Sequence, residues 1–142
     1  PTEINGAIGI EQLKKSNKFK IQRKQIFKQL IEIFNPYKDR IQHWLEFEKF
    51  VDPSPFSFCL IFKKKSDLNA IKKQFSLHGI EFRPIISGNI LRQPAFAKYK
   101  NQDKKKSNAN KVMDLGLYIG INPSTKLSNL NIIKVALKKT FI

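Results

Sequence analysis

A short strand pattern at residues 56–62 constrains the fold most, because it defines one buried face of a sheet. Phe56, Phe58, Leu60 and Phe62 occupy alternate positions, and alternate side chains of a strand point to the same face. Three lysines follow directly and mark a solvated strand end. We therefore expect this strand to lie against a hydrophobic core.

Helical patterns flank the strand on both sides. We expect a long helix within residues 1–35. It should be kinked or in two parts, because Ser16-Asn17 interrupts its apolar stripe. It should end at Asn35-Pro36, since proline cannot continue a helix. Two shorter helices are expected to begin at the capping residues Ser66 and Ser128. The first of these should end at His78-Gly79.

Two further strands are expected, over residues 80–86 and 115–121. Pro84 places the first at a sheet edge or ends it. The second carries small residues opposite its apolar face, which permits close approach of another backbone or a ligand. Residues 37–55 suggest a short strand or an extended segment. The lysine-rich residues 97–111 suggest a mobile segment. The prediction is an α/β fold: a small sheet of about three to four strands, helices on one face, and a long helix before it.

Charge and composition narrow the functional classes. The chain carries 27 basic and 11 acidic residues, a net charge of +16. Such a positive charge is typical of proteins that bind nucleic acid. Arginine is the residue preferred for contacts to phosphate and guanine, however, and only four basic residues are arginines: Arg23, Arg40, Arg83 and Arg92. The scarcity of arginine weakens that interpretation. The lone Cys59 excludes an internal disulfide. Because no apolar run approaches ~20 residues, we expect neither a membrane span nor a secretory signal.

Residues 82–94 form the most informative stretch for function. Polar groups gather there at the end of an apolar strand, where binding loops are common, and the stretch holds Arg83 and Arg92. A planar cation suits a phosphate or carboxylate, but Arg83 can equally be a strand-face residue and Arg92 a salt bridge at the entry of a helix. His78 and Cys59 are interpreted as structural, and nothing near His43 or His78 resembles a pair of metal ligands. No complete catalytic constellation is visible.

The same stretch resembles a known family. Phe82-Arg83-Pro84, Ser87-Gly88-Asn89 and Arg92-Gln93-Pro94 resemble the C-terminal region of PLP-dependent sugar-nucleotide enzymes of the DegT/StrS type. Residues 1–13 look like the helix linking that family's large and small domains, and residues 108–123 like its closing strand and turn. The resemblance covers essentially the whole chain in the family's order.

The resemblance implies the aspartate-aminotransferase fold, with residues 1–35 as the linking helix and residues 36–142 as the small domain. It implies a cytoplasmic homodimer that uses pyridoxal or pyridoxamine 5'-phosphate on a nucleotide-linked keto-deoxy sugar, in lipopolysaccharide or cell-wall sugar biosynthesis. The motifs look more like the C-3 dehydratase branch than the aminotransferase branch. The residues that would face the substrate are Arg83, Ser87, Gly88, Asn89, Arg92 and Gln93.

One departure from the family is severe. Its cofactor-anchoring lysine or histidine lies upstream of the part present here, so we expect no catalytic residue, no bound cofactor and no activity in this chain alone. Exposed apolar residues on the first helix would then favour self-association. Three readings stay open: C-3 dehydration, transamination by the same family, and a stand-alone basic module that binds nucleic acid. A catalytically empty interaction domain would leave residues 83–94 unexplained.

Overall fold

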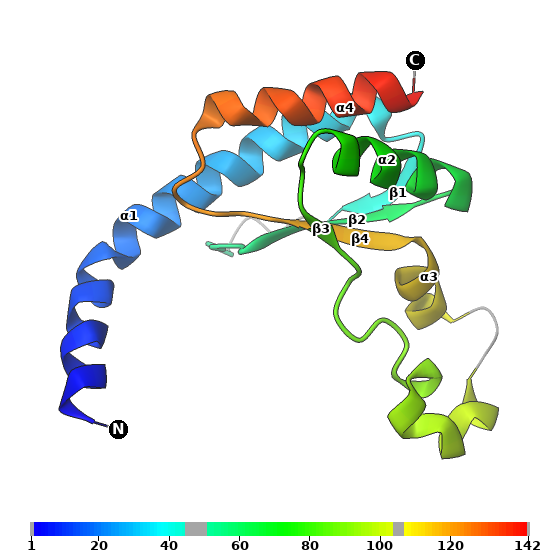
Figure 1. The fold of residues 1–142 in the computed structure, drawn as a ribbon, viewed down its shortest axis with the longest axis horizontal. Coiled ribbons are helices and arrows are strands. Elements are labelled where there is room, and N and C mark those ends of the chain that lie inside the picture. Colours follow the sequence, from blue (N-terminus) through cyan, green and yellow to red (C-terminus); the bar gives the residue numbers. More distant parts are fainter. Residues whose placement is uncertain (1, 45–50, 104–106, 142) are drawn as a thin grey trace.

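The structure is a computed structural model and describes residues 2–44, 51–103 and 107–141 (Figure 1). Short 3-10 turns at residues 35–37, 90–92, 94–102 and 127–130 connect the regular elements. In chain order these elements are α1 (Glu3–Phe34), β1 (Ile41–Trp44), β2 (Ser57–Phe62), α2 (Lys65–Leu77), β3 (Phe82–Arg83), α3 (Asn108–Leu115), β4 (Gly116–Gly120) and α4 (Asn131–Phe141).

Four antiparallel strands form one sheet in the order β1-β2-β4-β3. The central pair aligns Leu60 with Leu117 and Phe58 with Ile119, so the apolar faces of β2 and β4 coincide. The strand β3 is only two residues long and lies at the edge, because Pro84 cannot donate the next ladder hydrogen bond. The predicted small sheet and the edge position of this strand are confirmed.

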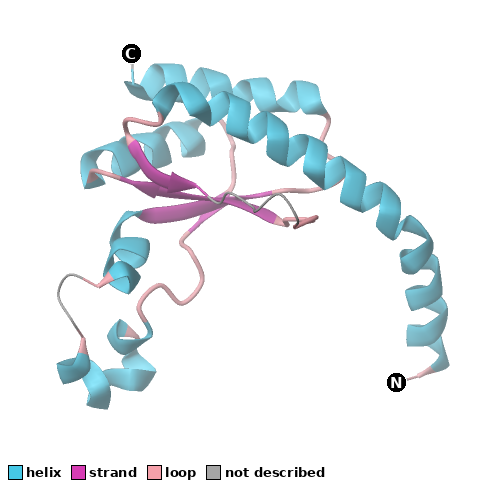
Figure 2. Ribbon diagram, turned by 180° about the vertical axis from the view of Figure 1, so that it is seen from behind, coloured by secondary structure: helices cyan, strands magenta, loops and turns pink. Residues whose placement is uncertain are grey.

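Three helices cover one face of the sheet. Figures 1 and 2 show the second half of α1, together with α2 and α4, on the same side, as the sequence predicted. Residues 84–115, which we call the arm, extend from the opposite side and include α3. We call residues 19–44, 51–83 and 116–141 the body. No helix in the described part of the chain has the length and apolarity needed to cross a bilayer.

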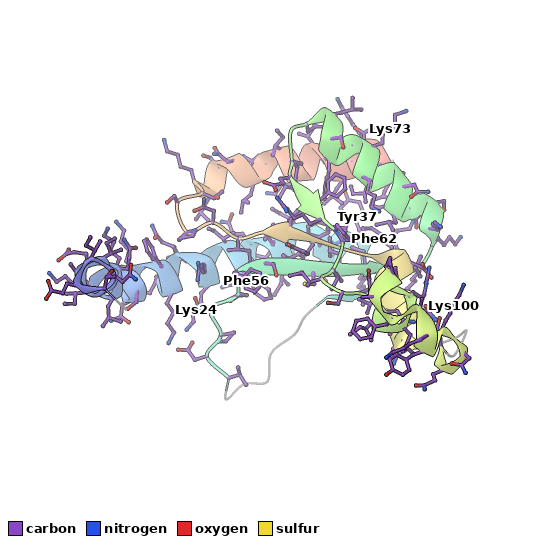
Figure 3. The ribbon with its side chains drawn as sticks, turned by 60° about the horizontal axis from the view of Figure 1, so that its bottom comes forward. Lys24, Tyr37, Phe56, Phe62, Lys73 and Lys100 are labelled. Atoms are coloured by element: carbon purple, nitrogen blue, oxygen red, sulfur yellow. The ribbon has the colours of Figure 1, made fainter. Side chains whose placement is uncertain are left out.

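The core of the body lies between the sheet and the three helices. Phe58, Leu60 and Phe62 are fully buried, and the Phe58 ring lies 5.3 Å from the rings of Phe27 and Phe34. Figure 3 shows Phe62 inside the body, with Lys73 on the outer side of α2. Phe56 was expected on the same buried face, but it precedes the strand and is 64% exposed.

The long helix α1 is a single helix, so the expected division into two parts at Ser16-Asn17 is wrong: both residues are helical. Figure 1 shows the helix bending along its first half rather than breaking. Its second half buries Ile26, Phe27, Leu30, Ile33 and Phe34 in the core, whereas every residue from 2 to 18 is exposed. The helix ends before Pro36, as predicted.

Several predicted boundaries shift. Ser66 lies inside α2, whose N-cap is Lys64, and Ser128 lies in the turn before α4 rather than at its cap. Leu115 ends α3 and is not the first residue of the strand. The helix α3 itself was missed, because an eight-residue helix shows too few turns for a clear apolar period. Of the segment expected to be mobile, residues 97–102 and 108–111 are helical, and residues 104–106 lie outside the description.

Candidate functional site

The candidate site is the loop that follows β3 and opens the arm. Ser87 and Gly88 both adopt positive φ, at 65° and 50°, which turns the chain sharply where a tight loop was predicted. A Cβ atom on residue 88 would lie 2.8 Å from the Met113 Cβ. Glycine is therefore needed at residue 88 both for its backbone conformation and for the close approach of α3.

The loop closes on itself through side-chain hydrogen bonds. The Asn89 Oδ1 accepts from the backbone N–H of Leu91 at 3.0 Å and so caps the short turn at residues 90–92. Gln93 Nε2 donates to the backbone oxygen of Ser87 at 3.0 Å. Residues 87–93 thus form one hydrogen-bonded unit.

A polar network ties this unit to the rest of the arm. Asn89 Nδ2 donates to Asp103 Oδ1 at 2.7 Å and to Asn110 Oδ1 at 3.0 Å. Asn110 Nδ2 donates to the same Asp103 oxygen at 3.0 Å. Asn89 is 3% exposed and Asn110 is 8% exposed, so the hydrogen bond between them is buried, and the two to Asp103 are partly buried.

Arg92 joins the network through one guanidinium nitrogen. Its Nη1 donates to Asn110 Oδ1 at 2.9 Å and to Asp114 Oδ2 at 2.8 Å. The hydrogen bond from Arg92 lowers the pKa of Asp114, and the same bond raises the pKa of Arg92. The Arg92 side chain stays about one third exposed (34%), so a cation remains accessible at the surface of the loop.

The structure brings together five of the six predicted substrate-facing residues, Ser87 to Asn89 with Arg92 and Gln93. Arg83 lies apart from them at the sheet edge, where Nε and Nη2 donate to Glu81 Oε1 at 3.0 and 2.8 Å. This hydrogen bond raises the pKa of Arg83. Arg83 also lines a groove of about 740 Å³ beside β3 and the start of α4. None of the other five residues lines that groove, and we favour the loop as the site because its polar groups converge.

Sequence reasoning missed three residues of the network: Asp103, Asn110 and Asp114. They lie 14 to 22 residues away from the loop residues that they bond, so no local spacing revealed them. One signal was available. Acidic residues are scarce in this chain, 11 against 27 basic ones, and two of them lie close in sequence: Asp103 before the helix α3 and Asp114 within its last turn.

The small residues opposite the apolar face of β4 permit a close approach at one position. A Cβ on Gly116 would clash with the carbonyl oxygen of Val112 and lie 2.8 Å from Ile85 Cδ1. The predicted close approach of another backbone is therefore confirmed at Gly116. Nothing lies within 4 Å of such an atom on Gly120. Gly116 therefore lets α3 and the start of the arm pack against the sheet.

The other candidate residues have structural surroundings. His78 is the C-cap of α2, and its Nδ1 lies 2.8 Å from the Gln74 carbonyl oxygen, as the structural interpretation predicted. Cys59 is half-buried, with Sγ 3.8 Å from Ser57 Oγ. The His43 side chain lies outside the described part. The described residues contain no group of three or more histidine, cysteine or acidic side chains placed to hold a metal.

The described residues include no buried lysine of the kind that could anchor pyridoxal phosphate. A lysine that forms a Schiff base is activated by a desolvated or cationic environment. The buried polar side chains in the described part are Asp67, Asn89 and Asn110, and no lysine is among them. Cofactor anchoring therefore cannot be assigned to these residues.

Comparisons with known proteins agree with the resemblance found in the sequence. The chain is 37% identical to a GDP-4-keto-6-deoxy-D-mannose 3-dehydratase of Yersinia pseudotuberculosis, over 94% of this chain and 35% of that protein. It is 33% identical to the protein of the same name from Escherichia coli O55:H7, over 97% of this chain and 36% of that protein. The chain thus spans about a third of the length of these curated relatives.

Solved structures match with the same coverage. The Escherichia coli GDP-4-keto-6-deoxy-D-mannose-3-dehydratase with bound hydrated PLP gives a TM-score of 0.77 at 26% identity, over 96% of this chain and 35% of that one. A mutant GDP-4-keto-6-deoxymannose-3-dehydratase with bound GDP-perosamine gives a TM-score of 0.78 at 26% identity, over 96% of this chain and 36% of that one. The model of the DegT/DnrJ/EryC1/StrS aminotransferase family matches residues 2–138. By this match, which covers nearly the whole sequence, the chain belongs to the DegT/DnrJ/EryC1/StrS aminotransferase family.

Proposed function

We propose that this chain supplies the substrate-facing loop of a PLP-dependent enzyme that removes the C-3 hydroxyl from a GDP-linked 4-keto-6-deoxy sugar. The observation that carries the proposal is the 37% identity, over 94% of the chain, to a protein named for that reaction. The convergent polar groups of residues 87–93 support it, because such groups orient a polar ligand. The proposal assigns neither the cofactor-anchoring residue nor the chemical step to residues of this chain.

Within the loop, Arg92 is the proposed phosphate-binding residue. A guanidinium carries five N–H donors, and the bonds to Asn110 and Asp114 both use Nη1. Its planar fork matches the geometry of a diphosphate oxygen pair. The exposed Ser87 and the side chain of Gln93 are proposed to orient the sugar, and Gly88 and Asn89 to shape the loop. Arg83 is proposed as an outer contact, because it lies at the sheet edge.

The domain arrangement and the environment are also proposals. We propose residues 1–35 as the helix that links the two domains; its second half packs in the core of the body, and its residues 2–18 are exposed. We propose residues 36–142 as the small domain, a homodimer for the intact enzyme, and the cytoplasm as its compartment. The supply of nucleotide sugars and PLP supports that compartment.

A turnover assay tests the proposed reaction. The intact protein that contains this chain is incubated with PLP, L-glutamate and GDP-4-keto-6-deoxymannose, and the product is analysed by mass spectrometry. A product that has lost the C-3 hydroxyl is expected. A 4-amino sugar would instead establish the transaminase alternative, and an unchanged substrate would overturn both.

An arginine series tests the role of the loop in the same protein. Arg92→Ala is expected to raise the KM for the nucleotide sugar by about tenfold or more, as loss of a charge-assisted hydrogen bond predicts. Arg92→Lys keeps the charge without the planar fork and should recover only part of the loss. Lys100→Ala removes an exposed cation elsewhere on the arm and is the control (Figure 3). Equal KM values for Arg92→Ala and Lys100→Ala would reject the assigned role of Arg92.

A further inference from the structure

We infer that Asp103 and Asn110 are positioning residues, which hold residues 87–93 in the conformation that presents the loop to its substrate. The inference rests on the proposed function of the loop and adds two residues to it. Neither residue belongs to the sequence motifs of the loop. Both reach it from the far end of the arm, 14 and 21 residues away from Asn89.

The hydrogen-bond geometry makes Asn89 the link between the loop and these two residues. Its Oδ1 holds the Leu91 backbone N–H, while its Nδ2 is shared between Asp103 and Asn110. Both functional ends of the amide are thus occupied, and its orientation is fixed. If Nδ2 loses its acceptors, a buried donor is left unsatisfied, which costs more than the hydrogen bond itself contributes.

Asp103 is a shared acceptor for two amides. Its Oδ1 accepts hydrogen bonds from Asn89 Nδ2 at 2.7 Å and from Asn110 Nδ2 at 3.0 Å. A carboxylate accepts hydrogen bonds only, so its presence determines which way both amide groups face. With the amide of Asn110 oriented in this way, Asn110 Oδ1 faces Asn89 and Arg92.

The same arrangement extends to the proposed phosphate-binding residue. Asn110 Oδ1 accepts from Arg92 Nη1 at 2.9 Å, so one oxygen contacts both Asn89 and Arg92. Ser107 Oγ accepts from the backbone N–H of Asn110 at 3.2 Å and fixes this residue in the first turn of α3. The rigid helix therefore sets the position of Asn110, and Asn110 sets the positions of two loop side chains.

Two of the apolar side chains in and beside the loop are largely exposed. Ile86 and Ile90 are 70% and 50% exposed, so neither anchors the loop in a core. The Ser87 and Gly88 conformations add backbone strain at Ser87, which a surrounding structure must hold. The network of Asp103 and Asn110 supplies that restraint.

Amide hydrogen exchange on the chain tests the conformational part of the inference. The reporters are the backbone amides of Leu91, Arg92 and Gln93, which bond to Asn89 Oδ1, Asn89 O and Ile90 O. Asn110→Ala and Asp103→Ala are each expected to speed exchange there by about tenfold or more, with the β4 amides unchanged. Asn122→Ala is the matched control, because Asn122 Oδ1 also bonds a backbone amide two residues on, that of Ser124.

A binding measurement on the intact protein completes the test, with GDP-perosamine as the probe. Asn110→Ala is expected to raise the dissociation constant about tenfold or more, because only the fraction of molecules with an ordered loop binds. Asn122→Ala should leave it unchanged. Unchanged loop exchange, or exchange that rises equally in β4, would overturn the inference, and so would unaltered binding by Asn110→Ala. If the unsubstituted protein fails to bind GDP-perosamine, the proposed function is overturned first and the inference falls with it.

Discussion

The body and the arm are held together by different interactions. Among the described side chains of the body, 19 buried hydrophobic ones form one continuous core. In the arm the buried side chains that the structure describes are polar: Asn89 and Asn110 are 3% and 8% exposed, and they bond each other, Asp103 and Arg92. Hydrophobic burial is non-directional, whereas a hydrogen bond requires a particular geometry. The body therefore depends on how completely apolar volume is filled, and the arm on how its polar side chains are oriented.

The difference suggests a division of labour. A core of aromatic and aliphatic residues supplies most of the folding free energy, since hydrophobic burial is the dominant favourable contribution. A small polar network contributes less, but it determines where individual donors and acceptors point. A loop that recognises a polar ligand needs the second property more than the first.

The largest loss of stability is expected when a cavity is created in the core of the body. Phe58→Ala removes a fully buried ring that contacts Phe27 and Phe34, and should cost about 3–5 kcal/mol of unfolding free energy. Phe56→Ala is the control on the same stretch of chain, because Phe56 is 64% exposed, and should change the free energy by no more than ~0.5 kcal/mol. Urea denaturation measures both. Similar losses for the two variants would remove the distinction between buried and exposed faces.

A smaller effect is expected at the junction between the loop and α3. In Gly88→Ala the residue keeps a positive φ, and its new Cβ would lie 2.8 Å from Met113 Cβ. The variant should lose about 1–3 kcal/mol of unfolding free energy. Gly79→Ala in the body has a similar φ of +66° but nothing within 4 Å, so it should cost only about 1 kcal/mol. Thermal denaturation of the pair isolates the cost of the contact. If Gly79→Ala were the more damaging, the close packing of the arm against α3 would be contradicted.

A pH-dependent effect is expected at the outer end of the network. Arg92 lowers the pKa of Asp114 in the folded state, so the folded state favours the carboxylate. That stabilisation is complete above the ordinary carboxyl pKa of about 3.9 and is lost as the pH falls through the lower folded-state pKa. Asp114→Asn should therefore remove part of the acid dependence of stability below about pH 4 and leave a small loss near neutrality.

Unfolding free energies measured in urea across this acid range check the prediction. Asp39→Asn, which removes an exposed carboxyl in the body, is the control. A stability curve of Asp114→Asn that parallels that of the unsubstituted chain at every pH would contradict the prediction. High salt should reduce the difference, because the Asp114 side chain is 43% exposed and the ion pair is partly screened.

The smallest effect is expected in the exposed first half of α1. Leu13 is 73% exposed, so Leu13→Ala should change the unfolding free energy by no more than ~0.5 kcal/mol. Leu30→Ala on the same helix removes a side chain that is 1% exposed, and should cost about 2–5 kcal/mol. Sedimentation of the Leu13 variant also tests the predicted self-association, which should weaken. A large loss of stability in Leu13→Ala would place this half of the helix in a folded contact.

The elements of the body could be predicted from the sequence because each has a repeating apolar pattern. The alternation at Phe58, Leu60 and Phe62, and the helical spacing of Leu68, Ile71 and Phe75, both match buried faces in the structure. The failures occurred where one local signal was given too much weight. Ser16-Asn17 did not break α1, because a helix continues through two weakly unfavourable residues, and the Ser66 and Ser128 hydroxyls were not used as caps.

The sequence by itself determined the fold class, the family resemblance and the stretch that holds the candidate site, because periodicity and short motifs are local properties. Only the tertiary structure decided what the site residues contact: it separated Arg83 from the loop and added Asp103, Asn110 and Asp114. These partners come from segments far apart in the chain, and a hydrogen bond depends on positions in space that spacing along the chain does not record.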